Sequence, residues 1–359
     1  MFLLAQERPV PRSLSKRLKK SLTLAVYWEN GSLVCEDYFS HVKIAISPAI
    51  VELLDLFRRS VDPKDAAKSN GFSSAEFRGA VDRLKRLGFL LSEDDKSRES
   101  IEKWHWGQAA RHFFFGTKDA SVHLPKAKRL AYAQKLLKES SQPSIYKEYP
   151  QAPKVALHRP ESFASKAGEV LSKVRDTRDF AFKPIPKECL SEILYLSCGE
   201  QGKINAKPWG DLLIKTYYSA GNRHPIEVYP VVVAVDGVEP GLYHYSVKDH
   251  ALELLKKGDF SAKVKAIANG QEWVKSASVY FLLTAVMERT SFKYRHDYFL
   301  QSIFADAGSL MQNIRIVAVG LGLNSCPTHS LRQSTASKFL GLEGARESLV
   351  GFALVGCNI

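Results

Sequence analysis

Alternating apolar and polar residues near the start of the chain predict a β-hairpin. The run 22–28 is followed by Asn30-Gly31 and then by the run 33–39. Asn-Gly readily adopts the positive φ angles of a type I′ turn, so the two runs are expected to pair. Ser47 and Pro48 then predict a helix start, with serine as N-cap and proline as the first helical residue.

A second helix is indicated by Ser73 and Glu76, which have the spacing of a capping box. Apolar residues then recur every three or four positions and would share one helix face: Phe77, Val81, Leu84 and Leu87. Gly88 ends this helix, and a short strand follows at 89–91. Together these elements predict a small winged-helix-like domain over residues 22–95, preceded by a basic tail over residues 1–21.

The remainder of the chain has two patterns. Residues 96–165 are polar and contain several prolines, apart from the aromatic segment 104–115, and they predict a linker. Residues 166–359 alternate helical and strand patterns, which predicts an α+β domain. Its expected helices lie at 191–196 and 304–321, and its expected strands at 228–235, 242–245, 252–255, 279–284 and 350–355.

Composition narrows the class of protein. Apolar residues make up 45% of the chain and charged residues 25%, which excludes wholesale disorder. There is no apolar run of about eighteen residues for a membrane span, and the apolar start 1–5 is too short for a signal peptide, so a cytoplasmic protein is expected. Five scattered cysteines without a CxxC pair argue against a disulfide scaffold, and no metal site is predicted.

The net charge of +13 is concentrated toward the N-terminus, where residues 1–150 hold 26 Lys and Arg against 18 Asp and Glu. A basic region of this kind attracts nucleic acid, a membrane surface or an acidic peptide, or it is simply a solvated surface. Charge by itself does not choose among these possibilities.

The familiar catalytic signatures are absent: there is no P-loop, HExxH, GxSxG or strand-following GxGxxG. Gly320-x-Gly322 is more typical of a helix C-cap than of a phosphate loop. Arg175 and Arg178, three residues apart at an expected helix start, are suited to a phosphate dianion, because guanidinium groups bind phosphate in a bidentate manner. Salt bridges to Asp176 and Asp179 are the alternative.

An ordered series of segments over about residues 100–359 resembles the SagB-type dehydrogenases of the nitroreductase-like flavoprotein superfamily. The matching segments are 174–180, 184–186, 218–229, 237–245, 289–294, 307–308, 312–313 and 320–327, and the aromatic segment 104–115 resembles the stretch that precedes the catalytic domain there. The resemblance implies a nitroreductase-like FMN-binding α+β fold and a homodimer. It also implies a precursor peptide as substrate and, as partner, a cyclodehydratase or another modifying enzyme.

The resemblance also assigns roles to individual residues. It implies that the FMN site contains Arg175, Arg178, Ser219, Ala220, Gly221, His224, Gln312 and Gly322. The two arginines would hold the phosphate, and the small residues 219–221 would let the backbone approach the flavin ring. Asn313, on the same apolar helix as Gln312, is expected to have a structural role.

Lys293 and Tyr294 are the expected catalytic pair, because azoline-oxidising members have Lys-Tyr at this place. Converting an azoline to an azole removes a hydride from one ring carbon and a proton from its neighbour. The flavin would take the hydride and Lys293 the proton, with Tyr294 orienting the amine or sharing the proton. The resulting hypothesis is a flavoenzyme of ribosomal peptide biosynthesis that oxidises a thiazoline or oxazoline.

Two alternatives remain for the activity: oxidation or oxygenation of another peptide side chain, such as an indole, or a non-catalytic peptide-binding scaffold or regulator. The winged-helix-like domain has two interpretations as well. It would either place a basic helix in a DNA groove or pair a leader peptide along its strand edge. The second is favoured beside a SagB-type domain, and binding of nucleic acid is not expected. Arg78, Lys85 and Arg86 would then attract acidic leader residues.

Overall fold

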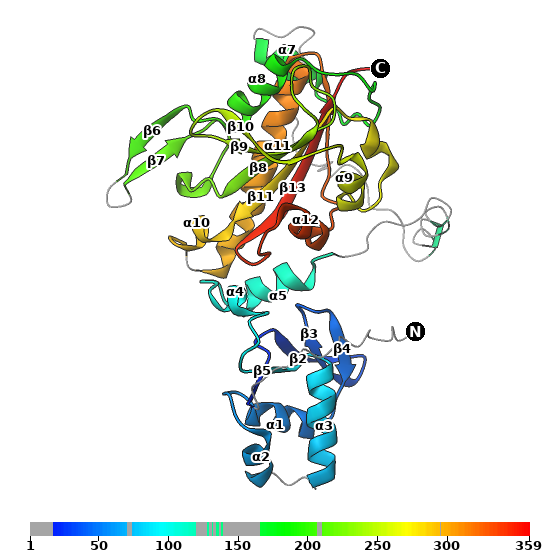
Figure 1. Ribbon diagram of the computed structural model, residues 1–359, viewed down its shortest axis with the longest axis vertical. Helices are drawn as coiled ribbons and strands as arrows, with labels where there is room; N and C mark the ends of the chain where they lie inside the picture. The colour runs from blue at the N-terminus through cyan, green and yellow to red at the C-terminus, as the bar shows by residue number, and fades with distance from the viewer. Residues whose placement is uncertain are drawn as a thin grey trace, which may run out of the picture. The chain divides into compact units, whose positions relative to one another are not determined.

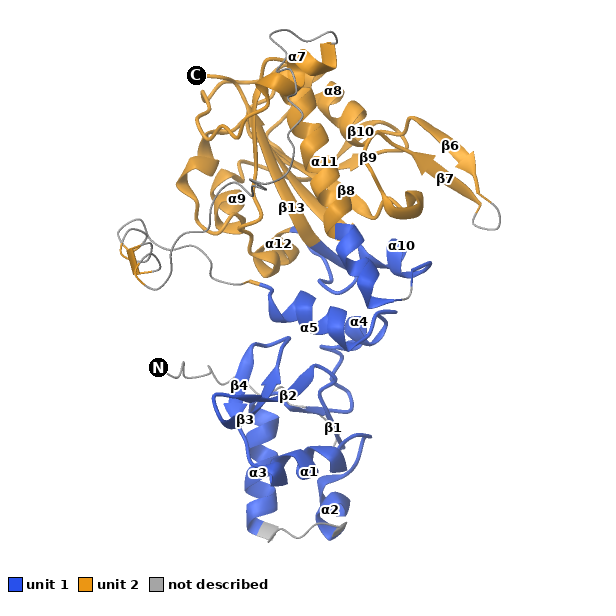
Figure 2. Cartoon of the chain, turned by 180° about the vertical axis from the view of Figure 1, so that it is seen from behind, with its two compact units in different colours: residues 1–118, 286–303, 340–348 blue, residues 119–285, 304–339, 349–359 orange. Residues whose placement is uncertain are grey.

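A computed structural model describes residues 17–69, 74–119, 166–206, 210–294 and 296–359, together with isolated helical positions between 128 and 138. The chain divides into two compact units, coloured separately in Figure 2. Unit 1 comprises residues 1–118, 286–303 and 340–348, and unit 2 comprises residues 119–285, 304–339 and 349–359. Two short stretches of the C-terminal half therefore group with the N-terminal part of the chain.

The N-terminal part of unit 1 contains two small antiparallel sheets (Figure 1). One pairs β1 (Leu18–Lys20) with β5 (Leu90–Ser92), and the other has the order β2 (Leu24–Glu29), β3 (Ser32–Asp37), β4 (Val42–Ala45). Between β2 and β3, Asn30 and Gly31 have φ angles of 48° and 75°. The hairpin predicted from Asn-Gly is therefore confirmed.

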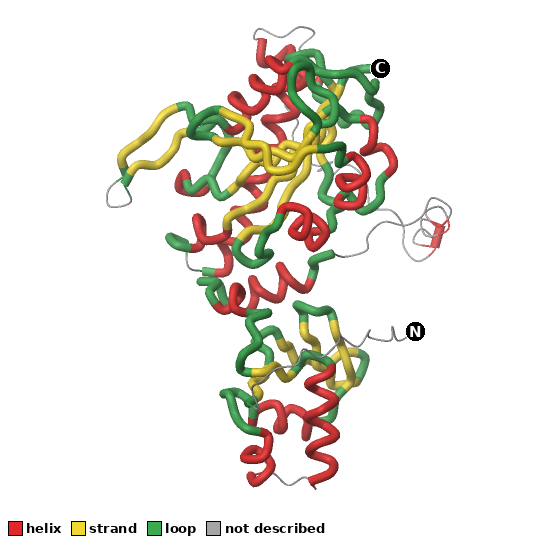
Figure 3. The backbone as a smooth tube through the Cα atoms, in the orientation of Figure 1, coloured by secondary structure: helices red, strands yellow, loops and turns green. Residues whose placement is uncertain are grey.

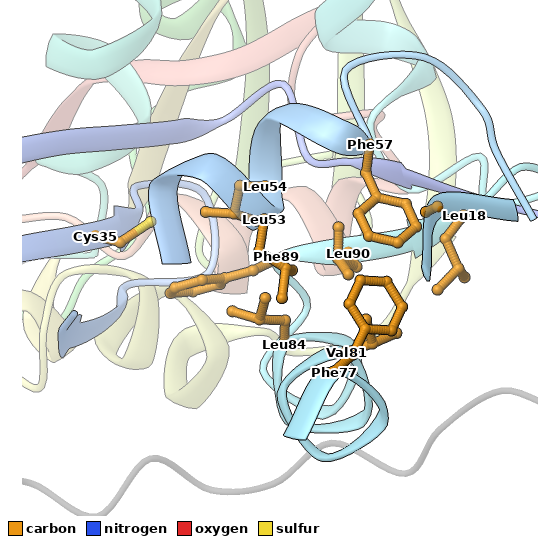
Figure 4. Packing of buried hydrophobic residues seen from close by; sticks show 11 residues of the cluster. Leu18, Cys35, Leu53, Leu54, Phe57, Phe77, Val81, Leu84, Phe89 and Leu90 are labelled. Carbon is orange, nitrogen blue, oxygen red and sulfur yellow. The ribbon is translucent and has the colours of Figure 1, made fainter. Parts of the chain in front are cut away.

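Three α-helices and a short 3₁₀ helix are described in this part of the unit: α1 (Pro48–Leu56), α2 (Pro63–Ala66), η1 (Ala67–Ser69) and α3 (Ser74–Arg86). Helix α1 begins at Pro48 as predicted, although the Ser47 side chain makes no capping hydrogen bond. Ser73 of the predicted capping box lies outside the described residues. The core that Figure 4 shows joins the helices to the strands, and in it the rings of Phe57 and Phe77 stack with centroids 6.4 Å apart.

The aromatic segment belongs to unit 1 and is helical. After α4 (Glu99–Glu102), it forms α5 (Gln108–Gly116) and the turn before it. Trp106 and Phe115 are each only 1% exposed. The other elements of the unit are α10 (Met287–Ser291) and the 3₁₀ helix η4 (Asp297–Phe299).

Unit 2 is built on a six-stranded sheet with the order β10-β9-β8-β11-β13-β12. Figure 3 draws its strands in yellow, with helices in red beside them. Its strands are β8 (Ile226–Val232), β9 (Gly241–Ser246), β10 (Ala251–Lys257), β11 (Val279–Val286), β12 (Asn324–Pro327) and β13 (Glu347–Gly356). Strand β11 is a continuous apolar run that is buried from Val279 to Ala285, as expected for a strand covered on both faces. Most residues of β10, the first strand in the order, are exposed.

Helices accompany this sheet, as expected for an α+β fold. They are α7 (Lys166–Lys173), α8 (Lys187–Cys198), α9 (Ser261–Ile267), α11 (Leu300–Gly320) and α12 (Gln333–Leu340), with short 3₁₀ helices η2 (Ala220–Asn222) and η3 (Glu272–Ser276). Helix α11 packs closely on the sheet at Gly351 of β13, where an added Cβ would lie 3.3 Å from the Met311 sulfur. The hairpin β6 (Gly202–Asn205) and β7 (Asp211–Ile214) was not predicted. No described helix is both long and apolar enough to cross a membrane.

Candidate functional site

The segment before and within η2 is held on one face of α11. Ser219 donates a hydrogen bond from Oγ to Asp306 Oδ2 at 2.6 Å, and the Ala220 backbone N–H points to Asp306 Oδ1 at 3.4 Å. The Tyr218 backbone N–H donates to Ser309 Oγ at 2.9 Å. Asp306 and Ser309 are three residues apart, so they share a helix face, and together they fix the turn that contains the expected flavin contacts.

The same helix face continues to Asn313, whose side chain donates to Thr216 Oγ1 at 3.2 Å. Gly221 has φ 60° and ψ 30°, in the left-handed region where glycine is favoured. His224 is buried, and its Nε2 lies 3.1 Å from the Leu213 carbonyl oxygen of β7. The backbone therefore turns sharply at residues 219–224 and is anchored on both sides.

Asp306 is a site residue that the sequence reasoning missed. It is 1% exposed, and burial raises the pKa of its carboxyl to about 6, although its hydrogen bonds to Ser219 and Ala220 oppose this shift. Asp306 and Arg315 are the only charged residues of α11. A charge on an otherwise apolar helix needs a partner, and that signal was present in the sequence.

Arg175 and Arg178 are not at a helix start. Helix α7 ends at Lys173, and the segment 174–180 between α7 and α8 has no helical residue. The prediction from helical i, i+3 spacing was therefore wrong, because residues three apart share a face only where the backbone is helical. The Arg178 guanidinium lies 5.1 Å from the Trp273 ring centroid, and Arg175 Nη1 donates to the Val174 carbonyl oxygen at 2.7 Å.

Arg315 of α11 brings a further guanidinium to this segment. Its Nη2 lies 2.6 Å from a carboxylate oxygen of Asp176, and its Nη1 donates to Gln312 Oε1 at 2.7 Å. Both Arg178 and Arg315 act electrostatically on the thiol of Cys326, although burial dominates and raises the pKa of that thiol. Arg178, Arg315 and Asp176 therefore lie close together, and Gln312 belongs to the same cluster.

The arginine cluster has an unused donor. Arg315 Nε is buried and has no hydrogen-bond partner among the described residues. A buried guanidinium N–H without a partner is unusual in proteins, and two guanidinium groups beside one carboxylate leave a net positive charge. This donor set fits a phosphate dianion.

Gly322 follows the end of α11, where its φ of 76° is the left-handed conformation of a helix C-cap. The Leu323 backbone N–H returns to the Ala318 carbonyl oxygen at 2.9 Å, as in a Schellman motif. An added Cβ at Gly322 would meet no atom within 4 Å. The preference for glycine here therefore comes from the backbone conformation.

Lys293 and Tyr294 lie in unit 1, in the loop between α10 and η4. Both are half-buried, and the Lys293 Nζ lies 5.1 Å from the Tyr294 ring centroid. The Tyr294 ring stacks on Phe299, with centroids 4.5 Å apart and planes inclined by 22°. The predicted pair is thus adjacent in space, with the tyrosine ring held in a fixed plane.

A groove in unit 1 runs between β4 and α3. Its volume is about 520 Å³, and it is lined by Ile44, Ala45, Ile46, Ser47, Ile50, Gly79, Ala80, Arg83 and Leu84. Strand β4 ends its sheet, and among the described strands it pairs with β3 alone. The groove is mostly apolar and has Arg83 as its one charged lining residue. Such an edge is suited to adding an extended peptide strand, with apolar side chains entering the groove.

Comparison with known proteins agrees with the fold of unit 2. The model of the Nitroreductase family matches residues 171–357. The trifolitoxin-processing protein TfxB of Rhizobium leguminosarum bv. trifolii is 30% identical over 180 residues, which are 48% of this chain and 48% of that protein. The putative nitroreductase MJ1384 of Methanocaldococcus jannaschii is 28% identical over 172 residues, 47% of this chain and 81% of that protein.

Solved structures are more distant in sequence. A putative nitroreductase from Anabaena variabilis superimposes with a TM-score of 0.45 and 20% identity, over 54% of this chain and 38% of that one. The chain spans about half the length of the trifolitoxin-processing protein. The predicted α+β fold of the nitroreductase type is confirmed by the family match, which covers the sheet and α11.

Proposed function

The chain belongs to the nitroreductase family, whose members are flavin-dependent oxidoreductases, and we propose that it is an FMN-dependent dehydrogenase of the SagB type. Its substrate would be a ribosomally made precursor peptide, in which it oxidises a thiazoline or oxazoline ring to the aromatic azole. The active form would be a homodimer that works beside a cyclodehydratase or another modifying enzyme.

The observation that carries the proposal is the presence, in one chain, of a nitroreductase domain and a separate open strand edge beside an apolar groove. A nitroreductase acting on small molecules needs no such groove, whereas an enzyme acting on a long peptide gains from a second binding site. The similarity to a protein named for trifolitoxin processing also supports a peptide substrate. The leader of the peptide would pair with β4, and its acidic residues would face Arg83.

The arginine cluster is proposed to hold FMN. Arg178 and Arg315 would bind the phosphate, with Arg315 Nε supplying the donor that has no partner among the described residues. Arg175 would assist from the same segment. The turn at Ser219, Ala220 and Gly221, fixed by Asp306, would lie against the ring with His224 behind it. FMN, when bound, would supply the acceptor for the hydride, which carries both electrons of the oxidation.

Lys293 is proposed as the base. Azoline oxidation removes a hydride from one ring carbon and a proton from the adjacent carbon, and it leaves an aromatic ring, so atoms and charge balance once a base holds the proton. Neutral Lys293 Nζ would accept this proton. Tyr294, fixed against Phe299, would orient the amine through its hydroxyl or share the proton.

The first experiment tests the cofactor. Purified protein should release FMN, not FAD, on denaturation. Replacing Arg178 and Arg315 together by Gln should strongly reduce FMN occupancy, because each charge-assisted bond to a phosphate contributes about 1.5–3 kcal/mol. Arg58→Gln, at an exposed position of α1, is the matched control. A colourless protein that cannot be reconstituted with FMN would contradict the proposal.

The second experiment tests the substrate. A thiazoline-containing precursor peptide should bleach the flavin in a single turnover and yield the thiazole. Ile46→Asp in the groove should raise the KM for the full-length peptide about tenfold or more, since a carboxylate would replace an apolar contact. The KM for the same peptide without its leader should not change in this variant. Val26→Asp on β2, the other edge strand, is the control. An FMN-loaded enzyme that no azoline peptide bleaches would point to another oxidised side chain.

A further inference from the structure

We propose that Trp106 and α5 form a joint that holds residues 292–294 and 296–299, and that Trp106 and Asp297 are positioning residues for Lys293 and Tyr294. The inference rests on the proposed function, because it concerns the loop that carries the proposed base. All the residues involved belong to unit 1, which Figure 2 draws in one colour from α5 to α10. The aromatic segment then has a function beyond linking two domains.

The first contact is a hydrogen bond from the Trp106 indole Nε1 to the Tyr294 backbone carbonyl oxygen, 3.0 Å long. Trp106 is 1% exposed, so its N–H needs a partner inside the protein. The bond is made to the backbone of the proposed catalytic residue itself. It therefore restricts the peptide group that sets the direction of the Tyr294 side chain.

The second contact caps α5. Asp297 accepts hydrogen bonds from the backbone N–H groups of Gly107 and Ala110, the latter at 3.4 Å. Gly107 is the N-cap residue of α5 and has no side chain to cap the helix itself. The loop thus supplies the carboxylate that the first turn of the helix requires, at the end where the helix dipole favours a negative charge.

Gly107 shows how closely the two segments approach. Its φ of −83° is accessible to any residue, so backbone conformation does not require glycine here. An added Cβ would lie 3.0 Å and 3.3 Å from the two carboxylate oxygens of Asp297. Alanine at this position would therefore displace the Asp297 carboxylate by a few tenths of an ångström and weaken its bonds to the first turn of α5.

Helix α5 also contacts the two aromatic residues that directly follow β3. Tyr38, just after β3, donates from its hydroxyl to Gln108 Oε1 at 3.2 Å, and its ring lies 5.1 Å from that of His112. Phe39 and Phe115 have ring centroids 5.5 Å apart. Strand β3 is also the hydrogen-bonding neighbour of β4. The joint therefore connects the proposed peptide-binding sheet to the proposed catalytic loop within one unit.

A buried ion pair anchors the segment that leads into α5. Arg98 Nη2 and Asp37 Oδ2 are 2.9 Å apart, with side chains 3% and 0% exposed. Thr23 completes the network, donating to Asp37 at 2.7 Å and accepting from Arg98 at 3.2 Å. Removing one partner of a buried, hydrogen-bonded pair is costly, so both Arg98 and Asp37 are needed to hold this segment in place.

The test uses the full-length holoenzyme and the variants Trp106→Phe, Asp297→Ala and Gly107→Ala. Hydrogen exchange of the amides in residues 293–299 should accelerate about 2- to 30-fold, the range that corresponds to the loss of a helix cap. The maximal rate of flavin bleaching by a short, leaderless thiazoline peptide should fall by up to about 10²-fold. The KM for that peptide and the FMN occupancy should change little.

Matched controls separate positioning from general destabilisation. Trp28→Phe removes an indole N–H at a position that is 71% exposed, and Asp62→Ala removes the N-cap carboxylate of α2. Neither should alter exchange in 293–299 or the bleaching rate. If Trp106→Phe unfolds, Asp297→Asn retains the size of the side chain and tests the joint through its second contact, the cap of α5.

The outcomes distinguish this inference from the proposed function. If hydrogen exchange in 293–299 is unchanged in all three variants, Trp106 and α5 do not hold these residues, whatever the activity of the variants. Faster exchange together with a normal bleaching rate would overturn the positioning role. If Lys293→Ala retains full activity, the proposed base is wrong, while the exchange result still decides whether α5 holds the loop.

Discussion

Two charged side chains on the apolar helix α11 organise the candidate site of unit 2. Asp306 fixes the turn at Ser219 and Ala220, and Arg315 joins Asp176 and Gln312. A charge on a mostly buried helix is retained only if partners compensate for its desolvation. The groups that hydrogen-bond to Asp306, Ser219 and the Ala220 N–H, are neutral. They offset only part of the effect of burial, which raises the pKa of the carboxyl.

Lys293 provides the most direct test at the residue scale. Lys293→Ala should keep the flavin and slow single-turnover bleaching by an azoline peptide by about 10²–10⁴-fold, the usual contribution of a positioned base. Lys293→Arg should not restore the rate, because a guanidinium does not release its proton at neutral pH. Tyr294→Phe should cost less if its hydroxyl only orients the amine. Lys64→Ala on α2 is the control, and a near-normal rate in Lys293→Ala would remove the assignment.

Asp306 predicts a pH dependence of stability. Its folded pKa of about 6 is above the value of 3.8 for the free side chain. The resulting stabilisation is fully present below about pH 4 and is lost as the pH rises through about 6, by roughly 3 kcal/mol at most. Asp306→Asn should abolish this dependence, as measured by urea unfolding between pH 4 and 7. Asp55→Asn, at an exposed position of α1, should retain it; a wild-type curve that is flat in this window would show that the shift is absent.

At the scale of elements, one row of side chains crosses three strands. His244 of β9 lies between Glu227 of β8, at 3.1 Å from Nε2, and Glu253 of β10, at 2.7 Å from Nδ1. The Glu227 hydrogen bond is the largest cause that raises the pKa of His244 to about 9, with Glu253 adding to it and burial opposing it. The charged imidazole thus links the edge strand β10 to the interior of the sheet.

This row gives a second pH window, separate from that of Asp306. The stabilisation by protonated His244 is fully present below about pH 6.5 and is lost as the pH rises through about 9. His244→Gln should therefore lower the unfolding midpoint at pH 6.5 and have a smaller effect at pH 9.5. Glu253→Gln, which leaves the Glu227 contact, should have an intermediate effect. An equal loss at both pH values would mean that the imidazole contributes through packing alone.

At the scale of the whole molecule, unit 1 unites three separate parts of the sequence. Trp104 Nε1 donates to the Ala345 carbonyl oxygen, and the Met287 backbone N–H donates to the Arg346 carbonyl oxygen at 3.0 Å. Residues 286–303 and 340–348 lie inside the stretch matched by the nitroreductase model, yet they group with the N-terminal domain. Removing that domain should therefore affect more than recruitment of the peptide.

Deletion of residues 1–95 tests this expectation. The remaining chain should still bind FMN, because Arg178, Arg315 and the turn at Ser219 are retained. Its activity on full-length peptide should be poor, since the groove is lost. Its bleaching rate with a leaderless peptide should also fall, by up to about 10²-fold, because α5 loses its contacts with Tyr38 and Phe39. Ile46→Asp differs from the deletion, because it should leave the bleaching rate with the leaderless peptide unchanged. If the deleted form bleaches at the full rate with the leaderless peptide, the N-terminal domain serves only to recruit the peptide.

The sequence by itself determined the local structure and the fold. The Asn-Gly hairpin, the helix start at Pro48 and the buried strand β11 follow from backbone preferences and hydrophobic period, which act over a few residues. The tertiary structure decided what depends on distant residues meeting. It showed that Arg178 lies near Arg315 instead of a helical neighbour and that Ser219 is fixed by Asp306. It also showed that Trp106 binds Tyr294 and that Asp297 binds Gly107, each pair about 190 positions apart in the sequence. Such partners are set by the packing of elements, and no local pattern contains them.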